Sequence, residues 1–109
     1  MSDRGSFCTQ YMYGDIDFDK LKKVFDYLEQ NYDISIAYIG KVVVAGRIKV
    51  GYPCGELDLV RGAFVPNIQT ILEEKSSLII TVICDCEEVV MFKIYKDKFD
   101  EISLTSDEE

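Results

Sequence analysis

Residues 34–50 read ISIAYIGKVVVAGRIKV, and this stretch decides the fold class of the chain. Residues of high β propensity fill both of its halves, and Gly40-Lys41 between them suits a tight turn. The stretch therefore predicts a hairpin of two antiparallel strands. Gly46 interrupts the second strand, which predicts either a bulge or a close backbone approach at that point.

A helix is predicted ahead of this hairpin, between Asp15 and Asn31. Its apolar residues recur every three or four positions, with charged residues between them, as on the buried side of an amphipathic helix. They are Phe18, Leu21, Val24, Phe25 and Leu28. Asp15 or Asp17 can cap the first free amide groups of this helix. A candidate strand, Phe7 to Tyr13, precedes it.

The second half of the chain predicts three further strands and one helix. Polar and apolar residues alternate over Glu56–Arg61, which predicts a strand with one solvated face. Pro66 suits the first turn of a short helix that reaches Lys75. Leu78–Ile83 is apolar on both faces, as a covered central strand would be, and Val89–Tyr95 follows it as the second half of a hairpin.

These elements follow one another in the order β-α-β-β-β-α-β-β within a single domain of residues 1–100. Local hairpins predict an α+β fold with a largely antiparallel sheet, and the two helices can pack on one face of it. The acidic residues 101–109 hold too little apolar surface to order themselves. We therefore expect a frayed C-terminal tail.

The charge of the chain bears on its partners and its location. Twenty acidic and twelve basic residues give a net charge of −8, and no run of Lys and Arg is present. We expect no direct binding to nucleic acid, and instead a basic protein partner, such as the phosphate-binding face of a nucleic-acid-processing enzyme. No apolar stretch approaches the roughly 20 residues of a membrane helix, and no signal sequence is evident, which together favour the cytoplasm.

The chain has four cysteines and no histidine. The cysteines are Cys8, Cys54, Cys84 and Cys86, and only the last two are close in sequence, as Cys-x-Cys rather than the usual knuckles of a zinc site. Buried or incidental thiols are the simplest interpretation, while disulfides and a metal site stay open. Without histidine, a cysteine nucleophile lacks its commonest base. We predict no metal and no cofactor.

The aromatic residues point to a binding surface. Seven tyrosines are present, and tyrosine is favoured at protein interfaces because it buries a large area while keeping a hydroxyl group, although it also completes the rim of many small cores. The predicted partner-binding residues combine tyrosines with carboxylates: Tyr11, Tyr13, Asp15, Asp17, Asp19 and Asp26. The leading hypothesis is a small acidic protein-binding module, an inhibitor or adaptor such as an immunity or viral counter-defence protein.

A carboxylate pair supplies the alternative hypothesis. The segment Gly55-Glu56-Leu57-Asp58-Leu59 resembles a Gly-Glu-Ile-Asp-Leu segment of the restriction-endonuclease-like metal-dependent nucleases. On a strand, Glu56 and Asp58 would share one face and could serve a small enzyme or ligand-binding domain, beside Arg61. That family also carries a second Glu-x-Lys on the following strand, whereas Glu73-Glu74-Lys75 here ends a predicted helix.

Self-association is a third hypothesis. The edge of a sheet pairs with other chains unless charges, proline or bulges block it. The predicted strand of residues 42–50 carries no obvious block. A homo-oligomer could therefore form along this sheet edge.

Overall fold

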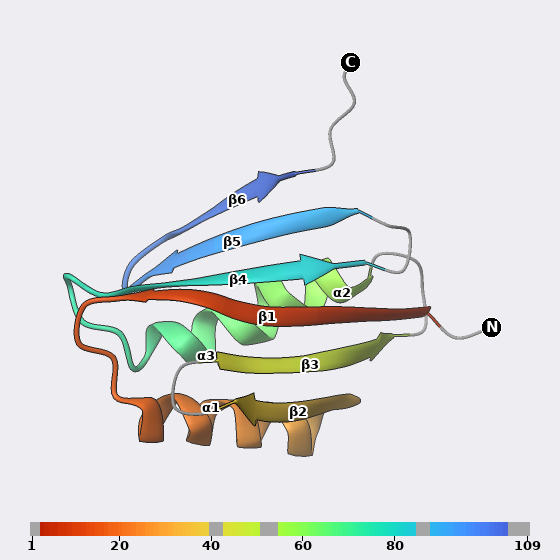
Figure 1. Cartoon of the computed structure of the whole chain (residues 1–109), viewed down its shortest axis with the longest axis horizontal. Helices are drawn as coiled ribbons and strands as arrows, with labels where there is room; N and C mark the ends of the chain where they lie inside the picture. Colours follow the sequence, from red (N-terminus) through yellow and green to blue (C-terminus); the bar gives the residue numbers. More distant parts are fainter. Residues whose placement is uncertain (1–2, 40–42, 51–54, 85–87, 105–109) are drawn as a thin grey trace.

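The computed structural model describes residues 3–39, 43–50, 55–84 and 88–104. Within them the chain forms a six-stranded sheet in the order β2-β3-β1-β4-β5-β6, and every neighbouring pair is antiparallel (Figure 1). The elements are β1 (Asp3–Tyr13), α1 (Phe18–Asn31), β2 (Ile34–Ile39), β3 (Val43–Val50), α2 (Gly55–Leu59), the π-helical turn η1 (Val60–Phe64), α3 (Val65–Gln69), β4 (Ser77–Ile83), β5 (Val89–Tyr95) and β6 (Phe99–Ser103). The predicted α+β class with an antiparallel sheet is confirmed.

β1 lies inside the sheet and joins two sets of strands that are local in sequence. β2 and β3 pair as the predicted hairpin, with Ile36 opposite Gly46, although the predicted turn at residues 40–41 lies outside the described residues. β3 also pairs with β1 along its other side. The prediction of an open edge at residues 42–50 is therefore wrong, because the edges of the sheet are β2 and β6.

α1 forms because its sequence supplies both a cap and an apolar side. The carboxylate of Asp17 accepts hydrogen bonds from the amides of Asp19 and Lys20, at 3.0 and 3.4 Å. The buried residues of α1 are Leu21, Phe25 and Leu28. The helices lie on one face of the sheet, as predicted (Figure 1). In the described part of the chain, none of them has the length and apolar character that a membrane span requires.

Three phenylalanines tie the helical layer to the centre of the sheet. Phe7 of β1 stacks on Phe25 of α1, with ring centroids 5.7 Å apart, and meets Phe64 of η1 edge to face at 5.0 Å. Gly46 lies opposite Phe7, where an added Cβ atom would stand 2.8 Å from the ring and closer still to the carbonyl oxygen of Ser35. The close backbone approach predicted at Gly46 is confirmed: the carbonyl oxygen of Ser35 on the neighbouring strand makes it, and the ring of Phe7 adds a second close contact.

Residues 55–69 depart from the prediction, because they form one continuous helical run. α2, η1 and α3 follow one another without a break, so the strand predicted over Glu56–Arg61 is wrong. Pro66 lies inside this run rather than opening a separate helix. Proline cannot donate the usual amide hydrogen bond, and the turn just before it is widened, with the amide of Val65 donating to the carbonyl of Val60.

The C-terminal end is ordered further along the chain than predicted. β6 pairs with β5 and places Ile102 opposite Met91. Residues 101–103 of the predicted tail therefore belong to the sheet, while residues 105–109 lie outside the described residues. Apart from this added strand and the helical run, the order of elements is close to the predicted one.

Candidate functional site: a groove at one end of the sheet

The end of β1 and the start of β4 lie next to each other at one end of the sheet (Figure 1). A groove lies there. Its volume is about 830 Å³, and it is lined by Tyr13, Gly14, Asp15, Glu73, Glu74, Lys75, Ser76 and Lys96. The hydroxyl of Ser76 donates to the carbonyl oxygen of Asp15 at 3.1 Å, and the ammonium group of Lys96 donates to that of Leu72 at 3.1 Å. These two bonds join loops that are far apart in sequence. The pairing of β1 with β4 brings the first two loops side by side, and the pairing of β4 with β5 brings the loop of Lys96 beside them.

A second hollow of about 470 Å³ continues from this groove onto the strands. It shares Tyr13, Glu74, Lys75 and Ser76 with the groove and adds side chains of β4 and β5, namely Ser77, Ile79, Lys93 and Tyr95. The Nζ atoms of Lys93 and Lys98 lie 5.4 and 5.0 Å from the centroid of the Tyr95 ring. The groove therefore extends from the polar loop residues Glu73–Ser76 to the ring of Tyr95 on the sheet.

The loop side of the groove is rich in carboxylates. Asp15, Glu73 and Glu74 are exposed there, and among the described residues their side chains take part in no hydrogen bond or ion pair. Tyr13 is 62% exposed in the same groove, which Lys75 and Lys96 also line. Carboxylates next to an exposed phenol ring can bind the ammonium or guanidinium group of another molecule.

The structure gathers part of the predicted partner-binding set at this groove. Tyr13 and Asp15 line it. Asp19 is exposed in the first turn of α1, close in sequence to the groove, whereas the carboxylate of Asp17 is used as the cap of that helix. Tyr11 is described by its backbone alone, which pairs with Ile79 after a bulge in β1.

Asp26 does not line the groove, and it holds β2 against α1. Its carboxylate accepts a hydrogen bond of 2.9 Å from the hydroxyl of Tyr38, whose ring meets Phe18 edge to face and lies 5.2 Å from the Nζ atom of Lys22. Burial, followed by the hydrogen bond to Asp26, raises the pKa of Tyr38 above its ordinary value of 10. Asp26 therefore has a structural role, and a charge reversal there would disturb folding as well as any interface.

The sequence interpretation misses Glu73 and Glu74 as site residues. It assigns them to the end of a helix, but α3 ends at Gln69 and both glutamates lie in the connection to β4. Three consecutive charged residues, Glu73-Glu74-Lys75, stand just before an apolar strand. This pattern favours an exposed loop over the end of a packed helix, and it is the signal that could have found them.

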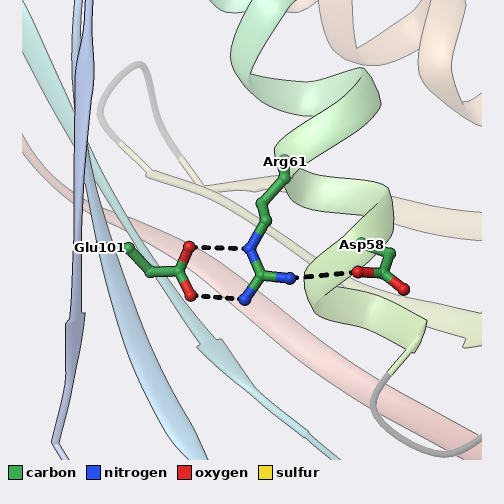
Figure 2. Close-up of polar contacts among 3 residues, drawn as sticks. All are labelled: Asp58, Arg61 and Glu101. Atoms are coloured by element: carbon green, nitrogen blue, oxygen red, sulfur yellow. Dashed lines mark hydrogen bonds and ion pairs between the residues drawn. The ribbon is translucent and has the colours of Figure 1, made fainter.

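A second polar cluster joins the helical layer to the edge strand β6 (Figure 2). The guanidinium group of Arg61 donates to both carboxylate oxygens of Glu101, at 2.7 and 2.5 Å, and to Asp58 at 3.1 Å. The bonds to Glu101 raise the pKa of Arg61, and the same bonds lower the pKa of Glu101 below its ordinary value of 4.5. Because these groups satisfy one another, the cluster fastens β6 in place and leaves little capacity for a ligand.

The alternative carboxylate site does not assemble. Glu56 is fully buried in α2, whereas the side chain of Asp58 is 62% exposed. Side chains two residues apart on a helix point to different sides, so the expectation that they share a strand face is wrong. Glu56 packs closely on β1, where a Cβ atom added to Gly5 would stand 2.6 Å from its Oε2 atom.

Two of the four cysteines lie within the described residues. Cys8 is half-buried in β1, and Cys84 is buried just after β4, while Cys54 and Cys86 lie outside the described residues. In the part of the chain that the structure describes, no three side chains of His, Cys, Asp or Glu come together as a metal site requires.

Of the clusters described, the groove is the one that combines open volume, exposed aromatic surface and carboxylates that the fold does not use.

A scan against protein-family models, a search of curated proteins and a search of solved structures each returned no match to this chain.

Proposed function

We propose that the protein is a small acidic protein-binding module that engages a basic segment of its partner through the groove. The observation that carries this proposal is the meeting of the exposed Tyr13 with the carboxylates of Asp15, Glu73 and Glu74 in one hollow. A lysine or arginine of the partner would lie among the carboxylates and against the ring of Tyr13. A few anchors of this kind, seated in a preformed hollow, can supply most of the affinity of an interface.

The overall charge supports a basic partner as well. A net charge of −8 attracts a basic surface over a distance and raises the rate of encounter, and added salt weakens that attraction. Asp19 and Asp17 follow the groove residues directly in sequence and add to the same field. Electrostatic steering of this kind sets the association rate and the choice of partner more than it sets the final affinity.

An inhibitor or adaptor is the role that fits this surface, because binding of this kind needs no reactive group in the module. Enzymes that act on nucleic acids expose basic faces for phosphate groups, and an acidic module can occupy such a face. An immunity protein or a viral counter-defence protein would act in this way. We place this activity in the cytoplasm.

Affinity capture from a lysate of the native source or host tests the proposal with two matched variants. Glu74→Lys reverses a groove carboxylate whose side chain makes no described contact, so folding should persist. Asp33→Lys makes the same change in net charge at an exposed position after the far end of α1. We expect the wild-type chain and Asp33→Lys to retain one stoichiometric partner, and Glu74→Lys to retain at least about tenfold less of it.

A second variant separates the aromatic contribution from the charge. Tyr13→Ala leaves the net charge unchanged and removes the exposed ring, so this variant should also retain less of the partner. Added salt should release the partner that remains bound as readily as it does from the wild type. Equal recovery of the partner by the wild type, Glu74→Lys and Tyr13→Ala would rule out the groove as the binding site. Capture of a partner whose surface is acidic would also contradict the proposal, because the proposal requires a basic partner.

A further inference from the structure

The face of the sheet turned away from the helices, here called the outer face, is not covered by any described element (Figure 1). Side chains alternate along each strand, and cross-strand pairing aligns the outward ones in rows. The middle row crosses all six strands and consists of Ala37, Ala45, Cys8, Thr81, Met91 and Ile102. None of these six side chains is charged, so an uncharged stripe runs across the whole outer face.

The outer face divides into a bulky half and a small half. The bulky half lies on β4, β5 and β6 and carries Ile83, Val89, Met91, Ile102 and Leu104. Ile83, Ile102 and Leu104 are 47, 43 and 52% exposed, which is unusual for large aliphatic side chains gathered on one surface. The other half lies on β1, β3 and β2, and most of its outward side chains are small: Ser6, Cys8, Ser35, Ala37 and Ala45. Arg47 lies between Ser6 and Ser35 in their row, and Ile39, 60% exposed, lies at the corner of this half on the edge strand β2. It is called the small half below.

We propose that two copies of this chain associate through their outer faces and are related by a two-fold axis. The axis lies between the two sheets, parallel to the strands and over the boundary between β1 and β4, which is the middle of the strand order. Rotation about it lays β4, β5 and β6 of one copy over β1, β3 and β2 of the other. The bulky half of each copy then meets the small half of its partner, so the same complementary contact is made twice. Sheets that pack face to face interlock their side chains in this way.

The distribution of charge permits this contact, although the chain as a whole is acidic. The charged side chains described on the outer face are Arg47, Lys49, Lys93 and Asp100, so this face is weakly basic while the chain carries a net charge of −8. All four lie outside the uncharged stripe, and Lys93 and Asp100 are paired across β5 and β6. In the proposed arrangement Arg47 lies opposite Val89 of the other copy, and its long stem can extend along the strand to carry the guanidinium group to solvent. An apolar centre with a polar rim is the usual anatomy of a protein interface.

The area is enough for a reversible dimer. Strands spaced about 4.8 Å apart, and three rows of outward side chains about 6.7 Å apart, give the face a projected area of roughly 500 Å² per copy. Side-chain relief adds to this, so the two copies together would bury roughly 1,000–1,200 Å², at the lower end for a specific interface. We therefore expect a dissociation constant on the order of micromolar.

Sedimentation equilibrium or light scattering over a range of concentrations tests the dimer. The wild-type mass should rise from 12.5 kDa toward twice that value as the concentration passes through the micromolar range. Ile83→Lys and Ala37→Lys place a charge in the bulky half and in the small half, at positions exposed in the monomer. Each should raise the dissociation constant at least about tenfold. Tyr27→Lys, at an exposed position on α1, is the matched control and should dimerise like the wild type.

Several results would overturn the proposal. A wild-type chain that stays monomeric up to about 1 mM has no such interface. A dimer that Ile83→Lys leaves unchanged uses another surface, such as the edge strands β2 or β6. Loss of association with Ile83→Lys but not with Ala37→Lys contradicts the stated arrangement, because that arrangement needs both halves. Circular dichroism spectra that match the wild type establish that each variant is folded.

Discussion

The two faces of the sheet are made by the same strands, yet they contribute differently to the molecule. On the helical face, the strands present large side chains that are almost fully buried, among them Phe7, Ile80 and Phe92. On the outer face, the neighbouring positions on those strands carry smaller or half-exposed side chains, such as Cys8, Thr81 and Met91. Stability is therefore concentrated on one face, which leaves the other face and the groove at its end available for contacts.

Truncation of a core ring gives the largest expected difference between the faces. Phe64→Ala should lower the free energy of unfolding by about 3–5 kcal/mol, because it removes a fully buried ring that contacts Phe7 and Phe25. Met91→Ala on the outer face should lower it by less than about 1 kcal/mol in the monomer. Denaturant unfolding at low protein concentration measures both values, and similar losses would mean that the two faces do not differ in this way.

Replacing either of two glycines by alanine should change the free energy of unfolding by an intermediate amount, in opposite directions for the two positions. Gly46→Ala should destabilise the protein by about 1–3 kcal/mol, because the new Cβ atom collides with the backbone at Ser35 and the ring of Phe7. Gly62→Ala is the control, since an added Cβ atom there meets nothing within 4 Å in a helical segment. It should raise the stability by up to about 1 kcal/mol. Thermal or denaturant unfolding that ranks the two variants equally would refute the close approach at Gly46.

Breaking the ion pair that attaches β6 to the helical layer should have the smallest effect on the free energy of unfolding, and this effect should depend on pH. Because the pKa of Glu101 is lowered in the folded state, its bonds to Arg61 stabilise the protein above the ordinary value of 4.5 and are lost as the pH falls through the lowered value. Glu101→Gln should therefore lower the free energy of unfolding by about 0.5–1 kcal/mol near neutral pH, a modest figure because the groups are partly exposed. The difference from the wild type should shrink in acid. A difference that stays constant with pH would show that the ion pair contributes nothing.

Strong local patterns made much of the fold predictable from the sequence. α1 and the β2–β3 hairpin follow from apolar spacing and turn residues that agree with the final packing. The helical run of residues 55–69 was harder, because the six residues from Glu56 alternate like a strand. A longer window shows the competing pattern, in which Leu57, Val60, Phe64 and Ile68 recur at helical spacing and are all buried. That longer pattern decides the structure.

The candidate site was predictable only where its residues are close in sequence. Tyr13 and Asp15 were found because they stand together beside a helix cap. Glu73 and Glu74 join them only through the pairing of β1 with β4, which is a tertiary event that no local pattern reports. The burial of Glu56 has the same cause, since it depends on the close packing of α2 against Gly5 of β1.

Binding of a basic partner at the groove is tested most directly by the association rate with the captured partner, measured at low and high salt for the wild type, Asp15→Lys and Asp33→Lys. The two variants change the net charge equally, so any difference between them reports the position of the charge and not its total. We predict that Asp15→Lys binds several-fold more slowly at low salt, with a flatter salt dependence than Asp33→Lys. Equal rates and equal salt dependence for the two variants would contradict binding of a basic partner at the groove.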